Sequence, residues 1–209
     1  MNAEQAYLLL VEDDPDILRL LNTTLTFKGY RVVTARNGKD GLDVIQGEHP
    51  AIVICDIMMP KLDGFGLVHR IRINPKTRDI PVVFITATYV APEDREFALN
   101  IGATRFIQKP VDMEKFLTTV AEVLKQGTPV RIEPLKELDF YAEYRKRLES
   151  KLDEKNRQIA RDEQLLGTHS AKEDAFLRAS LWHAISEREE LKLLLEQIYE
   201  QIQKHDKPE

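Results

Sequence analysis

The stretch Leu8-Leu9-Leu10-Val11-Glu12-Asp13-Asp14 decides the fold, because an unbroken apolar run passes directly into three acids. Such a run is typical of a strand buried on both faces, as in a parallel sheet that helices cover on each side. Ile52-Val53-Ile54-Cys55-Asp56 repeats the pattern, again with an acid after the apolar residues. Two buried strands that end in acids predict an α/β domain with carboxylates at one edge of its sheet.

Short apolar runs alternate with helical patterns along the first 126 residues. We expect strands at Tyr7–Val11, Tyr30–Ala35, Ala51–Cys55, Pro81–Thr86 and Arg105–Gln108, and helices at Asp16–Phe27, Gly38–Gln46, Gly64–Ile73, Pro92–Asn100 and Asp112–Lys125. Gly29 and Gly102 stand where the first and fourth helices must end. Strands that alternate with helices at this spacing imply right-handed crossovers and a parallel sheet.

Composition excludes several classes of protein. The single cysteine, Cys55, excludes a disulfide framework and a cysteine-based zinc cluster. A net charge of −5 argues against nonspecific attraction to nucleic acid or to a membrane as the main activity. No apolar run approaches the roughly 20 residues that span a bilayer, and no secretory signal is visible. We therefore expect a cytoplasmic protein.

The acids at the strand ends predict a metal site. Glu12, Asp13 and Asp56 converge if their strands are neighbours, and like charges about 4 Å apart repel by roughly 4 kcal/mol at an effective dielectric constant near 20. A cation relieves this repulsion, and an all-oxygen site suits Mg²⁺ or Mn²⁺. Asp14 before Pro15 is also a good helix N-cap. Capping explains that one acid but does not explain Asp56.

Other strand ends supply groups that bind a phosphoryl group. Thr86 and Ala87 follow one strand and offer a hydroxyl and backbone amides, and Lys109 follows another. These groups beside carboxylates and a divalent cation make a phosphoryl-binding site. Asp56 is then the natural nucleophile, and its product is an aspartyl phosphate. Lys109-Pro110 is a candidate cis peptide that aims the lysine inward.

Four motifs together resemble the receiver domain of two-component response regulators: Val11-Glu12-Asp13-Asp14, Asp56-Ile57-Met58-Met59-Pro60-Lys61-Leu62-Asp63-Gly64, Thr86-Ala87 and Lys109-Pro110. The resemblance covers roughly residues 5 to 126. It implies a flavodoxin-like (βα)5 fold with parallel strand order 2-1-3-4-5.

The resemblance also implies the chemistry. Asp56 would accept a phosphoryl group from a histidine kinase or a phosphotransfer protein, and would catalyse only its own phosphorylation and hydrolysis, so the chain is not expected to be an enzyme. Asp13 would bind Mg²⁺ directly and Glu12 through water. Asp56 and the backbone carbonyl of Met58 would complete the protein ligands.

Further roles follow from the same resemblance. Thr86 and Lys109 would each contact a phosphoryl oxygen, with the backbone of Ala87 beside them. Phe106 stands where the family keeps its switch aromatic. Thr86 would move toward the phosphate and leave a space for Phe106, which is a two-state population shift.

The sequence changes character after Gln126, where glycines become rare and charges denser. We assign residues 1–126 to the receiver domain, 127–134 to a linker and 135–209 to a second unit. Two long helical patterns, at about Pro134–Leu166 and Ala171–Gln203, flank Gly167-Thr168-His169-Ser170. The first has an apolar seam that three polar residues, Arg145, Lys155 and Asp162, interrupt; the seam residues are Leu138, Tyr141, Leu148, Leu152, Ile159 and Leu166. This arrangement predicts an antiparallel helical hairpin of coiled-coil type.

The second of these helices carries more apolar surface than one partner can cover. Trp182, Ile185, Leu194 and Tyr199 widen its stripe. We expect hairpins from two chains to pack into a four-helix bundle, so the protein is a homodimer. The alternative is a hairpin that folds back on its own receiver. We expect the polar runs Asp153–Gln158 and Arg161–Gln164 to face solvent.

The second unit lacks a helix-turn-helix with a basic recognition helix, so we expect an output through protein contact and not through DNA. The alternative is a phosphorelay component whose helical unit exchanges phosphate through His183. A lone helical histidine is usually structural or exposed.

Overall fold

The computed structural model describes residues 6–87, 89, 91–127, 134–166 and 171–205, with only the backbone of 171–173 and 205. The chain divides into two compact units, Met1–Leu135 and Lys136–Glu209. Most of the expected linker (residues 128–133) and the expected turn Gly167–Ser170 lie outside the described residues. Within the described part of the chain, no helix is long and apolar enough to cross a membrane.

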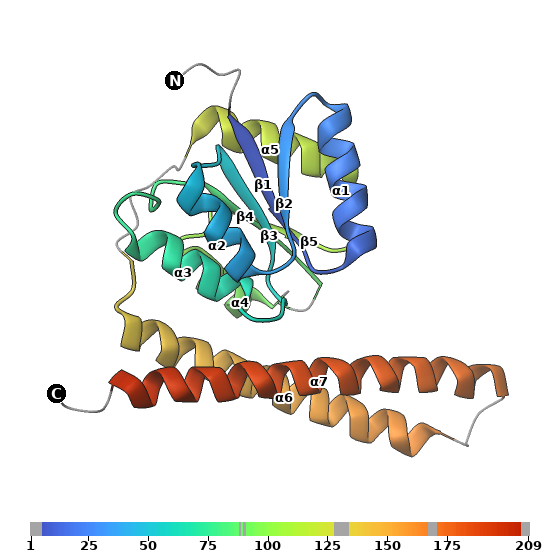
Figure 1. Ribbon diagram of the computed structural model, residues 1–209. Coiled ribbons are helices and arrows are strands. Elements are labelled where there is room, and N and C mark those ends of the chain that lie inside the picture. The colour runs from blue at the N-terminus through green and yellow to red at the C-terminus, as the bar shows by residue number, and fades with distance from the viewer. Residues whose placement is uncertain (1–5, 88, 90, 128–133, 167–170, 206–209) are drawn as a thin grey trace. The chain divides into compact units, whose positions relative to one another are not determined.

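The first unit is built on a parallel sheet of five strands (Figure 1). The strands are β1 (Tyr7–Val11), β2 (Arg31–Ala35), β3 (Ile52–Asp56), β4 (Val82–Thr86) and β5 (Arg105–Gln108). Their order in the sheet is β2-β1-β3-β4-β5, and each neighbouring pair is parallel. The flavodoxin-like topology expected from the sequence is therefore confirmed.

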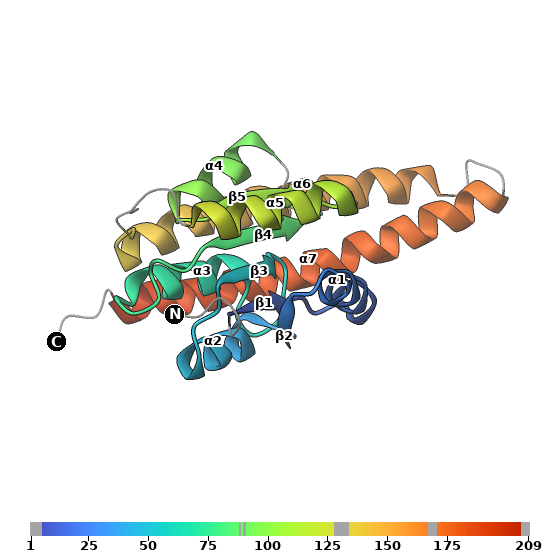
Figure 2. The same cartoon turned by 90° about the horizontal axis from the view of Figure 1, so that it is seen from above.

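Five helices cover the two faces of this sheet (Figures 1 and 2). They are α1 (Pro15–Phe27), α2 (Gly38–Gly47), α3 (Gly64–Ile73), α4 (Pro92–Asn100) and α5 (Met113–Gln126). One face packs against α1 and α5, where Leu21, Leu25 and Phe116 join the buried side chains of β1, β3 and β4. On the other face, Phe65 of α3 makes edge-to-face contacts with Phe84 and Phe97. Burial on both faces explains the unbroken apolar runs.

Glycines end two helices as the sequence predicts. Gly29 has φ 87° and Gly102 has φ 107°, in the left-handed region that favours glycine. At Gly102 there is a second reason, because an added Cβ would lie 2.6 Å from Nε of Arg72. Arg72 is buried and donates hydrogen bonds to the carbonyls of Gly102, Arg78 and Ile80. This arginine ties the end of α3 to the loops before β4 and β5.

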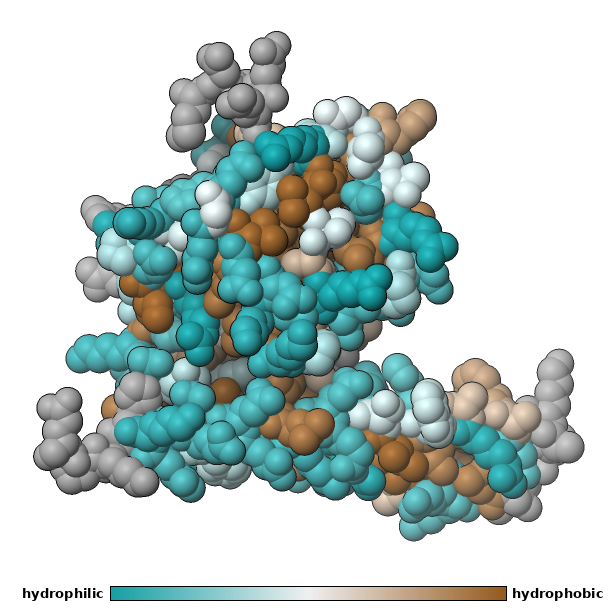
Figure 3. Space-filling model, in the orientation of Figure 1, coloured by the Kyte–Doolittle hydropathy of each residue, from teal (hydrophilic) through white to brown (hydrophobic). Residues whose placement is uncertain are grey.

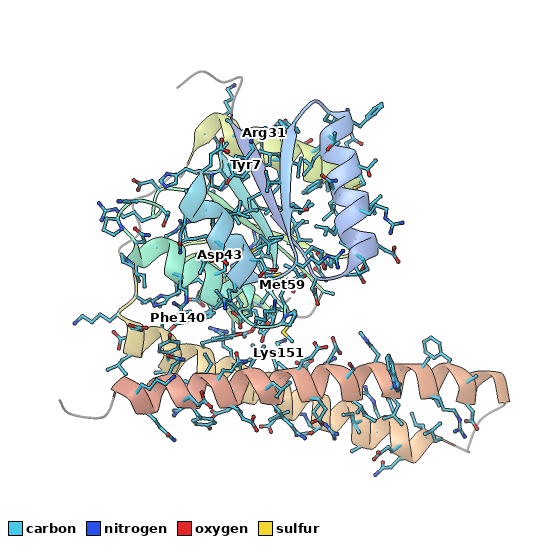
Figure 4. The ribbon with its side chains drawn as sticks, in the orientation of Figure 1. Tyr7, Arg31, Asp43, Met59, Phe140 and Lys151 are labelled. Atoms are coloured by element: carbon cyan, nitrogen blue, oxygen red, sulfur yellow. The ribbon has the colours of Figure 1, made fainter. Side chains whose placement is uncertain are left out.

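A small polar cluster closes the amino end of the sheet, opposite the acids. Arg31 of β2 lies over the ring of its β1 neighbour Tyr7, 5.3 Å from the ring centroid (Figure 4). Arg31 also pairs with Glu48, and the Tyr7 hydroxyl donates to the Glu48 carbonyl. The contacts among Tyr7, Arg31 and Glu48 hold this end of the sheet together. Among the described residues, no cluster of acids lies here.

The second unit is a pair of long helices that lie side by side (Figure 1). They are α6 (Glu137–Leu165) and α7 (Ala171–His205). The expected helical hairpin is confirmed, although α6 begins at Glu137 and not at Pro134. The expected seam is wrong at its start, because Leu138 is 46% exposed while Phe140 and Tyr144 are buried.

Polar residues that interrupt the α6 seam find partners on α7. Lys155 pairs with Glu187, and Asp162 accepts a hydrogen bond from Ser180. The expectation that Arg161–Gln164 faces solvent is therefore wrong for Asp162, which is 6% exposed. A buried carboxylate needs such a donor, since an unpaired buried charge is costly.

The widened apolar stripe expected on α7 is exposed only in part. Trp182 and Tyr199 are 74% and 40% exposed, as expected. Ile185 is half-buried, and Leu194 is buried, so the expectation is wrong for Leu194.

Candidate functional site

The site lies where the carboxyl ends of the three central strands meet. Asp56 is the last residue of β3 and pairs in register with Ile85 of β4. Glu12 directly follows β1, whose last residue Val11 pairs with Cys55 of β3. The Glu12 N–H donates to the Ala35 carbonyl at the end of β2. Because the strands are parallel neighbours, both carboxylates reach the same edge of the sheet.

Three carboxylates come together at this edge. Oxygens of Glu12, Asp13 and Asp56 lie within 4.8 Å of one another. Glu12 and Asp56 are 2% and 5% exposed, and Asp13 is exposed at the rim. All donors are oxygens and two are buried, which is the donor set that a hard dication prefers. These residues fit the expected Mg²⁺ or Mn²⁺ site.

Lys109 binds two of these acids at once. Its Nζ lies 2.8 Å from Oδ1 of Asp56 and 3.0 Å from Oε2 of Glu12. The Lys109-Pro110 peptide is cis, as the sequence predicts, and the Lys109 N–H donates to the Thr86 carbonyl. A single ammonium thus sits between two buried carboxylates, and the cluster keeps an excess of negative charge.

Burial and mutual repulsion show in the pKa values of the acids. Burial, together with the charge of Asp56, raises the pKa of Glu12 to about 7, against the opposing effect of Lys109. Burial raises the pKa of Asp56 to about 6, although Lys109 lowers it. For Lys109, burial lowers the pKa, but the two carboxylates outweigh burial and raise it. The site therefore lacks positive charge, which a bound dication would supply.

Thr86 ends β4 next to the acids and is buried, with 1% of its surface exposed. Its Oγ1 accepts a hydrogen bond of 3.4 Å from the N–H of Tyr89. Tyr89 is also buried, and its ring packs edge-to-face on Phe65 at 5.0 Å. Our sequence reasoning missed Tyr89; an aromatic residue three positions after a strand-end threonine is the only signal that could have found it.

The remaining candidates lie around this cluster. Phe106 is a half-buried residue of β5 in register with Phe84, and Ala87 is exposed just after β4. The backbone of Met58 hydrogen-bonds Asp56, which lowers the pKa of that acid. The roles of the Met58 carbonyl, Ala87 and Phe106 stay predictions.

The loop after Asp56 is held close to it by Gly64. The Gly64 N–H donates to the Ile57 carbonyl, and a Cβ at Gly64 would lie 2.3 Å from the Asp56 carbonyl oxygen. Asp63 caps α3 by accepting a hydrogen bond from the Gly66 N–H. Only glycine allows α3 to begin this close to the end of β3.

Asp14 has a different role from the three clustered acids, because it caps helix α1. Its side chain accepts hydrogen bonds from the N–H groups of Asp16 and Ile17 at the start of α1. These bonds lower the pKa of Asp14. Its carboxylate is not part of the cluster of three acids.

His183 lies on α7, and its side chain is 73% exposed. Its Nε2 lies 3.7 Å from Oε1 of Glu187. Phosphate exchange through this histidine stays a prediction.

The chain was compared with known proteins. The family model of the response regulator receiver domain matches residues 8–121. The chain therefore belongs to the response regulator receiver family, as its motifs predict.

Individual relatives agree with this assignment. The probable transcriptional regulator ycf27 of Porphyra purpurea is 35% identical over 130 residues, which are 62% of this chain and 52% of that protein. The transcriptional regulatory protein GlrR of Escherichia coli K12 is 38% identical over 138 residues, 66% of this chain and 30% of that protein. The chain thus spans about half or less of the length of these curated relatives.

Solved structures match the same part of the chain. The chemotaxis response regulator CheY4 of Vibrio cholerae is 30% identical with a TM-score of 0.53, and the match covers 56% of this chain and 98% of that one. A signal receiver domain of a histidine kinase from Syntrophus aciditrophicus gives 30% identity and a TM-score of 0.54, over 57% and 90% of the chains. These matches concern the receiver; the hairpin lies outside their extent.

Proposed function

We propose that Asp56 accepts a phosphoryl group from a histidine kinase or a phosphotransfer protein in the cytoplasm, in a reaction that depends on Mg²⁺. The supporting observation is the position of the Asp56 carboxylate, 2.8 Å from the Lys109 ammonium and within the cluster of three acids. A nucleophile, a cation for the phosphoryl oxygens and a donor set for a dication thus meet at one sheet edge. The chain contributes this chemistry to its own phosphorylation and is not an enzyme for other substrates.

The bonds that change are few. A carboxylate oxygen of Asp56 attacks the phosphorus of a phosphohistidine, an O–P bond forms, and the P–N bond to the donor imidazole breaks. Glu12, Asp13, Asp56 and the Met58 carbonyl would hold Mg²⁺, which neutralises negative charge on the phosphoryl oxygens. Lys109 would pair with another of these oxygens, and Thr86 would donate its hydroxyl to one more.

Phosphorylation would then change the surface of the receiver. Thr86 accepts a long hydrogen bond from the Tyr89 backbone in this structure, and a phosphoryl oxygen that accepted its hydroxyl proton would draw the side chain toward the phosphate. Movement of Thr86 would open space beside β5, where Phe106 is half-buried. The conformational equilibrium would shift because phosphate interacts better with one state.

We propose that the hairpin carries the output through protein contact and dimerisation and not through DNA. Its charges support this reading, since basic residues of the hairpin pair with acidic ones, Lys155 with Glu187 and Lys192 with Glu189, so fewer of them are left to bind phosphates. The relatives named as transcriptional regulators share the receiver and extend beyond the matched region.

Labelling with a small phosphodonor tests the phosphoacceptor. Full-length protein with Mg²⁺ and acetyl phosphate should gain one phosphoryl group by intact mass, and chelation of Mg²⁺ should prevent this. The Asp56→Asn variant should gain none, while the control Asp14→Asn, which changes a neighbouring acid outside the cluster, should label normally. Label that persists in Asp56→Asn would refute the assignment.

A further inference from the structure

Helix α7 has a second seam, on the side opposite the one that packs in the hairpin. At about 100° per residue, Ala175, Ala179, Trp182, Ser186 and Leu193 fall within an arc of roughly 60°. Trp182 is 74% exposed and Leu193 59%. The buried residues Ala184, Leu191 and Ile198 lie on the other side of the helix. We call these five residues (175, 179, 182, 186 and 193), of which all but the half-buried Ser186 are exposed, the outer seam.

The outer seam of one α7 is complementary to the outer seam of a second α7 that runs in the opposite direction. Trp182 and Ser186 are equally far from Ala184 along the helix, and so are Ala175 and Leu193. If a second α7 lies antiparallel with its midpoint at the same level, each large side chain faces a small one. Alternation of large and small residues across facing positions is what close packing of two helices requires. A twofold axis produces this match twice.

Charge favours the same antiparallel direction. On and beside the outer seam, the carboxyl half of α7 carries Leu193 and an excess of acids, with Glu189, Glu190, Glu196 and Glu200 against Lys204. The amino half carries the other seam residues and Arg178. A parallel pair would place the acidic halves against each other. An antiparallel pair places Arg178 near the level of Glu189 on the same flank and opposes the two helix dipoles. In Figure 3, hydrophobic residues on the visible face of the hairpin gather toward its right-hand end.

We propose that a second copy of this chain docks on the outer seam, with the two α7 helices antiparallel about Ala184 and Trp182 of each copy over Ser186 of the other. This inference rests on the proposed dimeric output of the hairpin and specifies its surface and direction. Trp182 is the central anchor, since exposed tryptophans that become buried at an interface usually dominate its binding energy.

Thiol cross-linking tests the direction. In an antiparallel pair, position 175 of one copy lies beside position 193 of the other, whereas equal positions are about 27 Å apart. A short bis-maleimide should therefore link Ala175→Cys to Leu193→Cys when the two full-length variants are mixed, and should link neither variant to itself. Cys55 is fully buried, and wild-type protein treated alike controls for it. Self-linking of each variant without mixed product would overturn the antiparallel arrangement.

Sedimentation of the full chain tests the surface. Wild type should be dimeric at micromolar concentration, and Trp182→Glu should weaken the dimer about 30-fold or more. Phe27→Glu, which removes another exposed aromatic side chain from α1, should leave the dimer unchanged. Helix content by circular dichroism checks that both variants fold, and Leu193→Glu provides a second seam variant. A dimer unaffected by Trp182→Glu and Leu193→Glu overturns the seam alone, whereas a wild-type monomer overturns the proposed dimeric output as well; neither result changes the labelling of Asp56.

Discussion

The two units bury charge in opposite ways. In the receiver, the Lys109 ammonium lies between the carboxylates of Glu12 and Asp56, so the buried cluster has excess negative charge. In the hairpin, Lys155 and Glu187 form a pair of equal and opposite charges, 17% and 16% exposed at their side chains. A buried cluster with excess charge can bind a further ion, while a balanced pair has no net charge left to attract one. The receiver cluster thus has charge left to attract an ion, whereas the hairpin pair joins two helices and has none.

Replacing the lysine of each group by methionine gives the sharpest contrast between the two units. The largest loss of stability is expected at Lys109. Lys109→Met leaves two carboxylates buried side by side, so the free energy of unfolding should fall by about 3 kcal/mol at pH 8 without Mg²⁺. Urea denaturation measures this. The double variant Lys109→Met/Asp56→Asn should recover most of the loss, because only one buried carboxylate remains. A double variant as unstable as the single one would show that the effect is not electrostatic.

The pH dependence of stability should also distinguish the receiver. Burial raises the pKa of Glu12 from 4.5 to about 7 and that of Asp56 from 3.8 to about 6, so the folded receiver holds these protons more tightly than the unfolded chain. Stability without metal therefore falls as the pH rises through this range. We expect a loss of about 2 kcal/mol between pH 6 and pH 8.

Magnesium should reverse this trend, because it binds the ionised carboxylates and so stabilises the fold more at pH 8 than at pH 6. Urea midpoints at both pH values, with Mg²⁺ and with a chelator, measure the effect. Asp56→Asn is the control, since one of the two titrating groups is then absent and the slope should be shallower. A slope that is the same in wild type and Asp56→Asn would contradict the assignment.

Sequence reasoning predicted the receiver better than the hairpin for a physical reason. In the sheet, strand ends are marked by a change from apolar to acidic residues at Val11-Glu12 and Cys55-Asp56, and parallel neighbours must bring such ends together. It could not predict that Lys109 contacts both acids before any phosphate binds, because that depends on distances between side chains. Tyr89 was missed because it contacts Thr86 through its backbone N–H, a group that every residue except proline has, so its aromatic side chain was the only signal of its place.

The hairpin is less predictable because helical periodicity does not state which polar seam residues will be paired. Asp162 fell within the seam spacing and also within a polar run, and its burial is explained by its hydrogen bond from Ser180 and its pairing with Arg161. Leu138 had the right spacing for the seam and is nonetheless exposed.

A smaller effect is expected from the balanced pair. Lys155→Met leaves Glu187 half-buried beside His183, so the free energy of unfolding should fall by about 1–2 kcal/mol. This loss should not depend on Mg²⁺, unlike that of Lys109→Met, and thermal denaturation with and without the metal compares the two. Lys155→Met/Glu187→Leu should restore stability, because an apolar pair of similar size replaces the charges. A loss that Mg²⁺ corrects would contradict the distinction between the two units.

The smallest effect separates two adjacent acids at the rim of the receiver site. Asp14 accepts two N–H groups at the start of α1, so Asp14→Ala should cost about 1 kcal/mol of stability through the lost N-cap. It should leave the affinity for Mg²⁺ and the labelling of Asp56 unchanged, because its carboxylate lies outside the cluster. Asp13→Ala should do the reverse: it removes a carboxylate of the cluster and no helix cap, so the affinity for Mg²⁺ should fall while stability without metal holds or rises. Titration of Mg²⁺ by calorimetry and urea denaturation of both variants decide the matter. Equal losses of metal affinity in the two variants would contradict the assignment of helix capping to Asp14 and metal binding to Asp13.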